Sequence, residues 1–273
     1  MVDLSIIRKR KAKKIIIIVG AASLVTVAVI SAVALLGQHA SPLTVTLNNS
    51  GASLTLSETG NTEDGDKTSF LLAKEVPGYQ EIDGNLINQN YSDAYLDSEK
   101  NQDSVLATTE GDYKVTLFFK YTFFIENNGE NAADYLLTLN ISNQNRNVSE
   151  FDLTDILRVR FYENFDLEKH EYKTYAKGAS VFDEESNQYV DVPVPIGKNM
   201  GNAEMFESNR VALRSEVKNF EAGQKVRYTF VIWLEGNDID SYGKMAPVGS
   251  SLSLGVNISA HEATGETSEE SSN

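Results

Sequence analysis

Strict alternation of apolar and polar side chains over a long stretch is the feature that most restricts the fold of this chain. From Tyr113 to Ile125 every odd-numbered position is apolar or aromatic, whereas the even positions include lysines and threonines. A period of two places neighbouring side chains on opposite faces of a strand, so the segment predicts a long strand with one face in a core. The Asn-Asn-Gly sequence at 127–129 then favours a turn.

Several other segments alternate in the same way, and they lie at 135–142, 157–161, 226–234 and 252–259. No amphipathic helical patterns of about 10–15 residues separate them, as a parallel α/β fold would require. Segments 43–47 and 54–56 flank an Asn-Ser-Gly sequence and predict an opening hairpin. Short helices are expected at 149–156 and 203–209. The chain is therefore expected to be mainly β, with the architecture of an antiparallel β-sandwich.

Residues 15–37 form an uncharged, largely apolar run of 23 positions. As a helix this run would be about 34 Å long, enough to cross a hydrocarbon core of about 30 Å. Residues 1–14 hold six Lys/Arg and one acid, Asp3. The positive-inside rule then predicts a single-pass signal anchor in the cell membrane, with a basic cytoplasmic segment at 1–14 and an extracellular region from residue 38 onward.

A cleavable signal peptide is the alternative for the same region. The apolar run is longer than the usual stretch of about 7–15 residues. The sequence before a cut after Ala40 is Gln-His-Ala, which lacks a small residue where one is preferred, and the better Ala-Val-Ala sequence at 32–34 lies inside the apolar run. We therefore favour an uncleaved anchor.

The outer region, expected as a sandwich at 38–260, contains one stretch of different texture. Residues 57–112 are rich in acidic and amide side chains, and we expect them to form a loop-rich acidic insertion. Residues 261–273 have no apolar period and predict a disordered acidic tail.

The charge balance excludes one class of partner. Beyond residue 14, the chain has 18 Lys/Arg against 38 Asp/Glu, a net charge of −20. Proteins that bind nucleic acid need clustered basic residues to displace counterions, so we expect no nucleic-acid partner. The chain has no cysteine, which excludes cysteine nucleophiles and the common cysteine-based zinc sites.

The sequence carries no catalytic motif that we recognise. Its three histidines are His39, His170 and His261. The latter two are each followed by Glu, but Thr174 and Gly265 stand where a zinc-protease helix has its second histidine. No G-x-S-x-G elbow and no phosphate-binding loop of the Walker type occur. We expect a non-enzymatic protein without a cofactor.

Two acidic turns are weak candidates for a Ca²⁺ site. Asp64 and Asp66 place oxygen ligands at alternate positions but lack the downstream glutamate of a calcium loop. Glu235, Asp238 and Asp240 follow a predicted strand and offer three carboxylates. The alternative, which we favour for both turns, is an ordinary solvated acidic turn.

Trp233 is the only tryptophan, and it lies on the face of its strand opposite the row Val226, Tyr228, Phe230. It is a candidate contact residue, because an exposed aromatic side chain can dock a partner. The alternative, which we favour, is that it packs under a loop or against a second layer.

Four segments taken together resemble a known group of proteins. They read YTFFIENNG at 121–129, LRVRFY at 157–162, TYAK at 174–177 and YTFVIWLEGND at 228–238. In this order they resemble uncharacterised, membrane-anchored, β-rich envelope proteins of low-GC Gram-positive bacteria, with W-L-E-G-x-D as the most distinctive motif. The resemblance covers roughly residues 113–260. Ile239 stands where that group often has a proline.

In overall plan the chain is also similar to camelysin and TasA-like exported β-sandwich proteins. The resemblance implies a location in the cell envelope and a sandwich fold, and it supplies no catalytic residues. Camelysin-type proteins have been classed as metallopeptidases, but this chain has no zinc signature that supports the class here.

Three functional hypotheses follow. The first is a surface protein that binds other surface proteins, wall polymer or matrix. The second is a fibre or biofilm-matrix subunit, released by signal cleavage, that self-associates by donating the strand at 43–47 to a neighbour. The third is an envelope hydrolase.

Overall fold

The computed structural model describes residues 43–60, 67–74, 81–99, 105–108, 114–143, 152–238 and 252–263. The chain divides into two compact units, Met1–Ala40 and Ser41–Asn273, and all described residues belong to the second. Within these ranges, no helix is long and apolar enough to cross a bilayer. The predicted segments 1–14 and 15–37 lie outside them.

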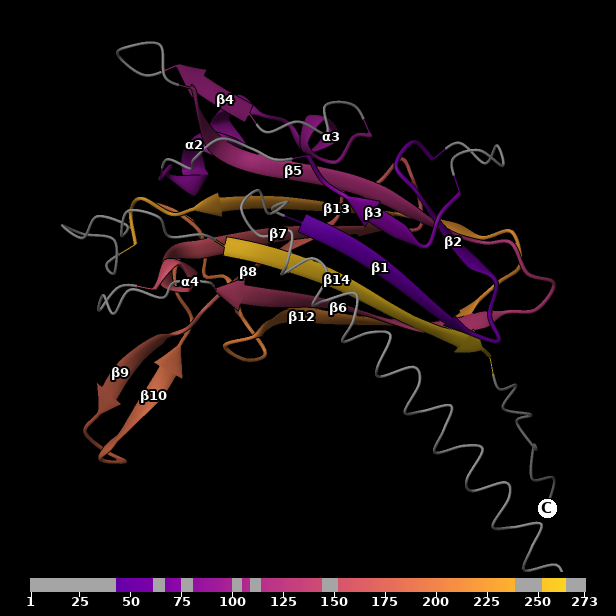
Figure 1. Cartoon of the computed structure of the whole chain (residues 1–273). Coiled ribbons are helices and arrows are strands. Elements are labelled where there is room, and N and C mark those ends of the chain that lie inside the picture. Colours follow the sequence, from indigo (N-terminus) through magenta and orange to yellow (C-terminus); the bar gives the residue numbers. More distant parts are fainter. Residues whose placement is uncertain are drawn as a thin grey trace, which may run out of the picture. The chain divides into compact units, whose positions relative to one another are not determined.

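The described part of the chain is mainly β and has two large sheets (Figure 1). The five-stranded sheet has the order β12-β6-β14-β1-β3, with the bounds Val211–Phe220, Ala133–Asn143, Leu252–Glu262, Leu43–Ser50 and Phe70–Leu72. The seven-stranded sheet has the order β11-β8-β7-β13-β5-β2, and β4 also pairs with β5. Its strands are β11 (Glu204–Met205), β8 (Tyr172–Ala176), β7 (Leu157–Asn164), β13 (Lys225–Leu234), β5 (Lys114–Asn127), β2 (Leu54–Ser57) and β4 (Val105–Thr108).

The two sheets pack over one shared hydrophobic core. The odd-numbered side chains of β5 from Phe119 to Ile125 and the even-numbered side chains of β13 belong to it, as the alternation predicts. They are buried together with alternate residues of β6 and β14. The core residues of β5 and β13 include Phe119, Tyr121, Phe123, Ile125, Val226, Tyr228, Phe230 and Ile232. Those of β6 and β14 include Leu137, Leu139, Leu254, Val256 and Ile258. Each such side chain stabilises the fold by about 1.5–3 kcal/mol relative to leaving it in water.

The opposite face of β7, β13 and β5 is also buried. Residues 81–99 cover it with two short helices, α2 at Gly84–Asn90 and α3 at Asp93–Leu96, which lie beside β5 in Figure 1. A second apolar cluster fills the space, and its buried members are Ile87, Leu96, Phe118, Tyr162, Val231 and Trp233. The expected loop-rich insertion at 57–112 therefore contains helices and strands that complete the fold.

The expected opening hairpin is wrong. β1 pairs with β14 in parallel and with β3 in antiparallel orientation, whereas β2 pairs with β5 in the other sheet. The turn between β1 and β2, where Gly51 has φ of 90°, crosses from one sheet to the other. The pairs β1–β14 and β11–β8 are parallel, so the sheets are not purely antiparallel. Alternation predicts that a segment is a strand, but it does not identify the strand's partner.

Two further expectations concern helices. The first is confirmed over four residues: α4, Leu153–Ile156, begins with a capping box between Asp152 and Asp155 and leads directly into β7. The second, at 203–209, is wrong, because Glu204–Met205 form strand β11 beside β8.

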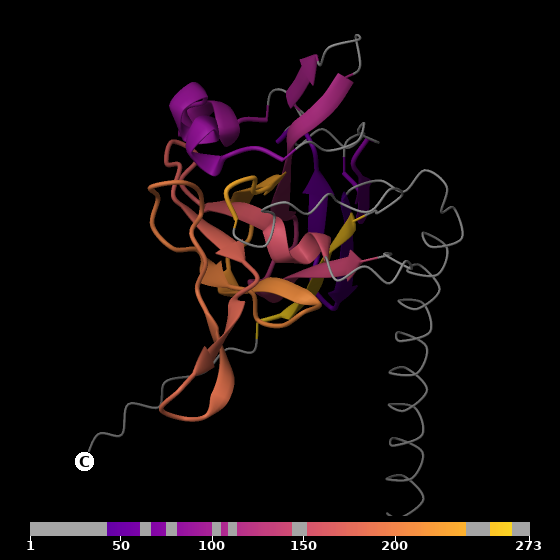
Figure 2. The same cartoon turned by 90° about the vertical axis from the view of Figure 1, so that its left-hand side faces the viewer.

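One pair of strands belongs to neither large sheet. β9, Ala179–Asp183, and β10, Gln188–Val192, form their own two-stranded sheet. Both views show this hairpin extending away from the two sheets (Figures 1 and 2). Its base rests on a small cluster of Ala176, Val194 and Ala203. We call residues 179–192 the arm.

Candidate functional site

Asp97, which caps the end of α3, is the centre of a buried polar cluster. Its side chain accepts from Arg227 at two points, Nε to Oδ1 at 3.1 Å and Nη2 to Oδ2 at 2.7 Å. Thr229 Oγ1 donates to Oδ1 at 2.7 Å, and Asn164 Nδ2 donates to Oδ2 at 2.5 Å. His170 Nδ1 lies 3.0 Å from Oδ2. The carboxylate is thus held by side chains from β7, β13 and the loop after β7.

His170 is oriented by this contact. An ionised carboxylate can only accept hydrogen bonds, so the Nδ1 atom of His170 carries a proton and donates it to Asp97. When the ring is neutral, its Nε2 atom is the acceptor. The side chain is 28% exposed, so the ring reaches solvent.

Lys120 holds the same segment from β5. Its Nζ atom donates to the carbonyl oxygen of Tyr95 at 2.8 Å and to Ser98 Oγ at 3.0 Å. Burial lowers the pKa of Lys120 to about 8, and the carboxylate of Asp97 opposes part of this effect. Thr122 Oγ1 on the same face of β5 donates to the carbonyl oxygen of Ser98 at 3.0 Å, so Lys120 and Thr122 together anchor the end of α3.

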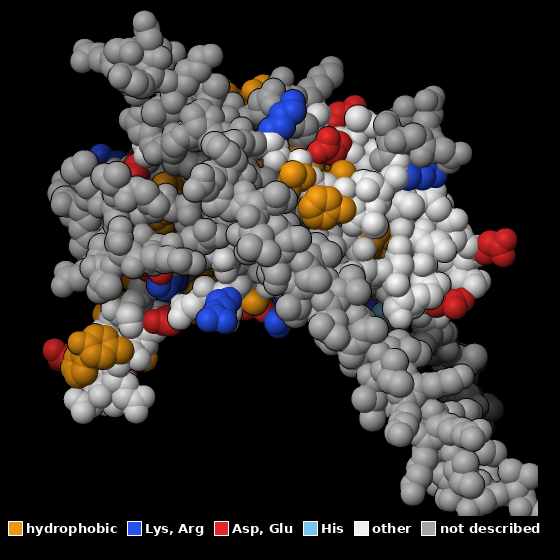
Figure 3. Space-filling view, in the orientation of Figure 1, with side chains coloured by type: hydrophobic (Ala, Val, Ile, Leu, Met, Phe, Trp, Pro, Cys, Tyr) orange, Lys and Arg blue, Asp and Glu red, His pale blue; other side chains and the backbone are white. Residues whose placement is uncertain are grey.

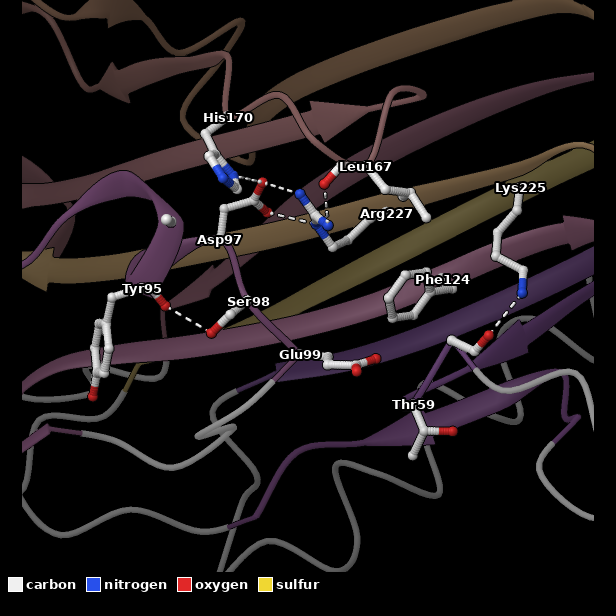
Figure 4. A pocket seen from close by; sticks show the side chains of 12 residues that line it. Thr59, Tyr95, Asp97, Ser98, Glu99, Phe124, Leu167, His170, Lys225 and Arg227 are labelled. Carbon is white, nitrogen blue, oxygen red and sulfur yellow. Dashed lines mark hydrogen bonds and ion pairs between the residues drawn. The ribbon is translucent and has the colours of Figure 1, made fainter.

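A cavity of about 700 Å³ opens beside this cluster. Its described lining consists of Thr59, Gly60, Ala94, Tyr95, Asp97, Ser98, Glu99, Phe124, Leu167, His170, Lys225 and Arg227. In Figure 4, His170, Asp97 and Arg227 lie on one side, Glu99 and Thr59 on the other, and Phe124 and Lys225 at one end. The strands, the end of α3 and the loop after β7 thus all contribute to one pocket.

The residues of W-L-E-G-x-D hold residues 81–84 against β13. Trp233 is fully buried, and its Nε1 atom donates to Glu235 Oε2 at 3.0 Å. The same oxygen accepts from the backbone N–H of Gly84 at 2.8 Å. The N–H of Gly236 donates to the carbonyl of Ile82 at 3.0 Å. Trp233 therefore packs against a second layer, the alternative favoured from the sequence, and it presents no surface to a partner.

The calcium candidates that the structure describes are engaged within the fold. Glu235 is 1% exposed, and its second oxygen accepts from the N–H of Asn237 at 3.0 Å. Asp238 forms an ion pair with the buried guanidinium of Arg158. The described ranges contain no group of three metal-ligating side chains. The remaining candidates, Asp64, Asp66 and Asp240, lie outside these ranges.

The arm exposes apolar side chains on both of its faces. Phe182 and Tyr189 are paired across the two strands, with ring centroids 5.4 Å apart. Val181 and Val190 are paired on the opposite face. Tyr189 is 73% exposed and the other three are 39–47% exposed. Figure 3 shows hydrophobic side chains on the visible face of the projecting hairpin.

The turn at the tip of the arm contains side-chain hydrogen bonds. Asp183 accepts from Ser186 Oγ at 2.7 Å and from the N–H of Glu185 at 3.1 Å, and these bonds lower the pKa of Asp183. Asn187 adopts a φ of 55°, a left-handed conformation that asparagine tolerates. The arm therefore presents its side chains from a defined turn.

The sequence reasoning missed both the arm and the Asp97 cluster. Short alternation on either side of an Asp-Glu-Glu-Ser-Asn turn at 183–187 was the available signal for the arm. No local pattern marks Asp97, because its partners lie 67 to 132 residues further along the chain. No protein-family model and no curated protein sequence matches the chain.

Proposed function

We propose that this chain is a non-enzymatic, membrane-tethered protein of a Gram-positive cell envelope. A β-sandwich of mainly antiparallel strands follows a single N-terminal transmembrane helix in the sequence and binds a partner protein through the arm. The observation that carries this proposal is the exposure of Val181, Phe182, Tyr189 and Val190 on a projecting hairpin.

Exposed apolar surface on both faces of the arm is best explained by a partner that covers it. A two-stranded hairpin without its own core is marginally stable, and nothing in the fold requires large side chains on it. Contiguous apolar side chains on a protein surface mark interaction sites. Aromatic residues such as Phe182 and Tyr189 are also the type enriched at the centres of protein interfaces.

The charge of the arm indicates the chemistry of the partner. Residues 179–192 contain Asp183, Glu184, Glu185 and Asp191 and no Lys or Arg. A second copy of the arm, an anionic polymer and an anionic lipid surface would all be repelled. A protein surface with an apolar groove and a basic rim is complementary. This supports a protein partner among the classes expected from the sequence.

Native electrophoresis of membranes solubilised in mild detergent tests the contact. The wild type and the control Phe165→Ser, which changes a 42% exposed aromatic outside the arm, are expected to migrate in one larger complex. The double variant Phe182→Ser/Tyr189→Ser is expected to migrate alone. Identical migration of all three proteins would overturn the proposal.

The tether rests on the apolar run at 15–37 and the basic residues before it. Intact mass and N-terminal sequencing of the protein from membrane and extracellular fractions test it. A full-length chain confined to membranes is expected. A chain beginning near Ala40, found outside in sedimentable form, would replace the tether with signal cleavage and favour the fibre subunit.

The position of β1 supports the fibre subunit as a second candidate. Leu43 and Val45 are fully buried, and the strand is held between β14 and β3. β1 and β14 are neighbours in the sheet but lie far apart in the sequence. The β1 strand of a neighbouring copy would therefore fit beside β14 in place of the chain's own β1.

A disulfide staple separates the two candidates. Thr46 and Asn257 are paired across β1 and β14, and the chain has no other cysteine to interfere. In Thr46→Cys/Asn257→Cys, oxidation locks β1 into its own sheet. The tethered module keeps its complex when oxidised. Loss of assembly on oxidation and its return on reduction would instead establish strand donation.

A further inference from the structure

The cavity beside Asp97 has a chemistry that the arm does not share. It lies where the end of α3 meets the outer face of β5 and β13, and the loop after β7 closes one side (Figure 4). Its volume of about 700 Å³ is within the range of small-ligand sites.

The described lining carries balanced charge. Arg227 and Asp97 neutralise one another in a bidentate pair. Lys225 and Glu99 line the same cavity, so a second cation is matched by a second anion. The domain as a whole is strongly acidic, but the described lining of this pocket has no excess of either sign with which to select a charged ligand.

The same lining offers hydrogen bonds of both kinds. The exposed carboxylate of Glu99 accepts, and so does the Nε2 atom of His170 when its ring is neutral. Lys225 donates one N–H to the carbonyl of Gly60 at 2.7 Å, which leaves further N–H groups on the ammonium for a ligand. Phe124 and Leu167 add apolar surface.

We propose that this cavity binds a neutral, hydroxyl-bearing ligand of the size of a disaccharide. A hydroxyl group both donates and accepts, so it suits a pocket whose described lining has donors and acceptors and no net charge. The carbon–hydrogen faces of a sugar ring suit the apolar surface of Phe124 and Leu167. The buried Asp97 holds His170 and Arg227 in place before any ligand arrives, which lowers the entropic cost of binding.

Saturation-transfer NMR on the full chain tests this proposal. The protein is kept in a detergent without a sugar headgroup, and the probes are cellobiose and maltose, with glucosamine and glucuronate as cationic and anionic comparisons. Transfer to the neutral disaccharides, stronger than to either charged sugar, is the expected result. No transfer to either disaccharide would overturn the proposal, and so would stronger transfer to a charged sugar.

Two exposed glutamates supply a matched pair of variants. Glu99→Ala removes a lining acceptor and is expected to weaken disaccharide binding about tenfold or more, as for a hydrogen bond to a charged group. Glu130→Ala, at the turn between β5 and β6, is expected to leave binding unchanged. Equal affinity of both variants and the wild type would place binding elsewhere and overturn the assignment. The same measurement with dextran, a neutral polysaccharide, identifies the source of the sugar. Transfer to dextran indicates a sugar that is part of a polymer, and transfer to the disaccharides alone indicates a free sugar.

Discussion

Arg227 on β13 and Asp97 at the end of α3 form a two-point ion pair across 130 residues of sequence. The Asp97 side chain is fully buried and that of Arg227 is 10% exposed. The pair joins the second face of the seven-stranded sheet to residues 81–99. A stretch that looks like an insertion in the sequence is therefore bound to the sheet by a desolvated charge pair.

Removing one partner of this pair is expected to destabilise the protein strongly. In Arg227→Met the carboxylate of Asp97 stays buried without its main counter-charge, which costs about 3–5 kcal/mol. The control Arg214→Met breaks an exposed pair with Glu207 and is expected to cost under about 1 kcal/mol. Urea unfolding measures both. Equal losses would mean that the Asp97 pair is no more important than a surface contact.

Lys120 is expected to make stability rise with pH. Its folded pKa of about 8 lies below the ordinary value of 10.5, so between these values the unfolded state binds more protons than the folded state. The contribution of Lys120 to the free energy of unfolding therefore increases from about pH 8 toward pH 10.5. In Lys120→Met this increase is absent. Urea midpoints measured across this range compare the two proteins, and parallel curves would contradict the lowered pKa.

Buried tyrosines are expected to reverse this trend at higher pH. Burial raises the pKa of Tyr175 to about 12 and raises that of others further, namely Tyr121, Tyr135, Tyr162 and Tyr228. Above about pH 10 the unfolded chain ionises its tyrosines while these stay protonated in the fold, so the free energy of unfolding falls. The tyrosinate absorbance of these five side chains should then appear together with unfolding. Gradual ionisation of all tyrosines in the folded protein would show that they are accessible.

Two aromatic residues of opposite exposure are expected to behave differently. Trp233→Ala removes a fully buried side chain and a donor to Glu235, and should cost about 3–5 kcal/mol. Tyr189→Ala removes a side chain that is 73% exposed and should change stability by no more than about 0.5 kcal/mol. Thermal or urea unfolding measures both. A large loss in Tyr189→Ala would give the arm a structural role in place of a contact role.

The sequence predicted several core strands, among them β5, β6, β7, β13 and β14, but it did not predict β12 or the two strands of the arm. Alternation identified the inner rows of β5 and β13, because a strand's two faces are local in sequence. It did not reveal that the row with Lys120 and Thr122 is buried too, since long-range partners such as Asp97 neutralise and hydrogen-bond it. For the same reason Glu235 and Asp238 resembled metal ligands, whereas their partners are Trp233, Gly84 and Arg158.

Photo-cross-linking on intact cells tests the role of the arm most directly. A benzophenone amino acid is placed at position 189 on the arm and, as a control, at position 165 in the loop after β7. The proposal predicts one discrete cross-linked product with a different protein from position 189, lost when Glu184 and Glu185 are changed to lysine, and none from position 165. A covalent dimer of the chain itself from position 189, or the same products from both positions, would contradict it.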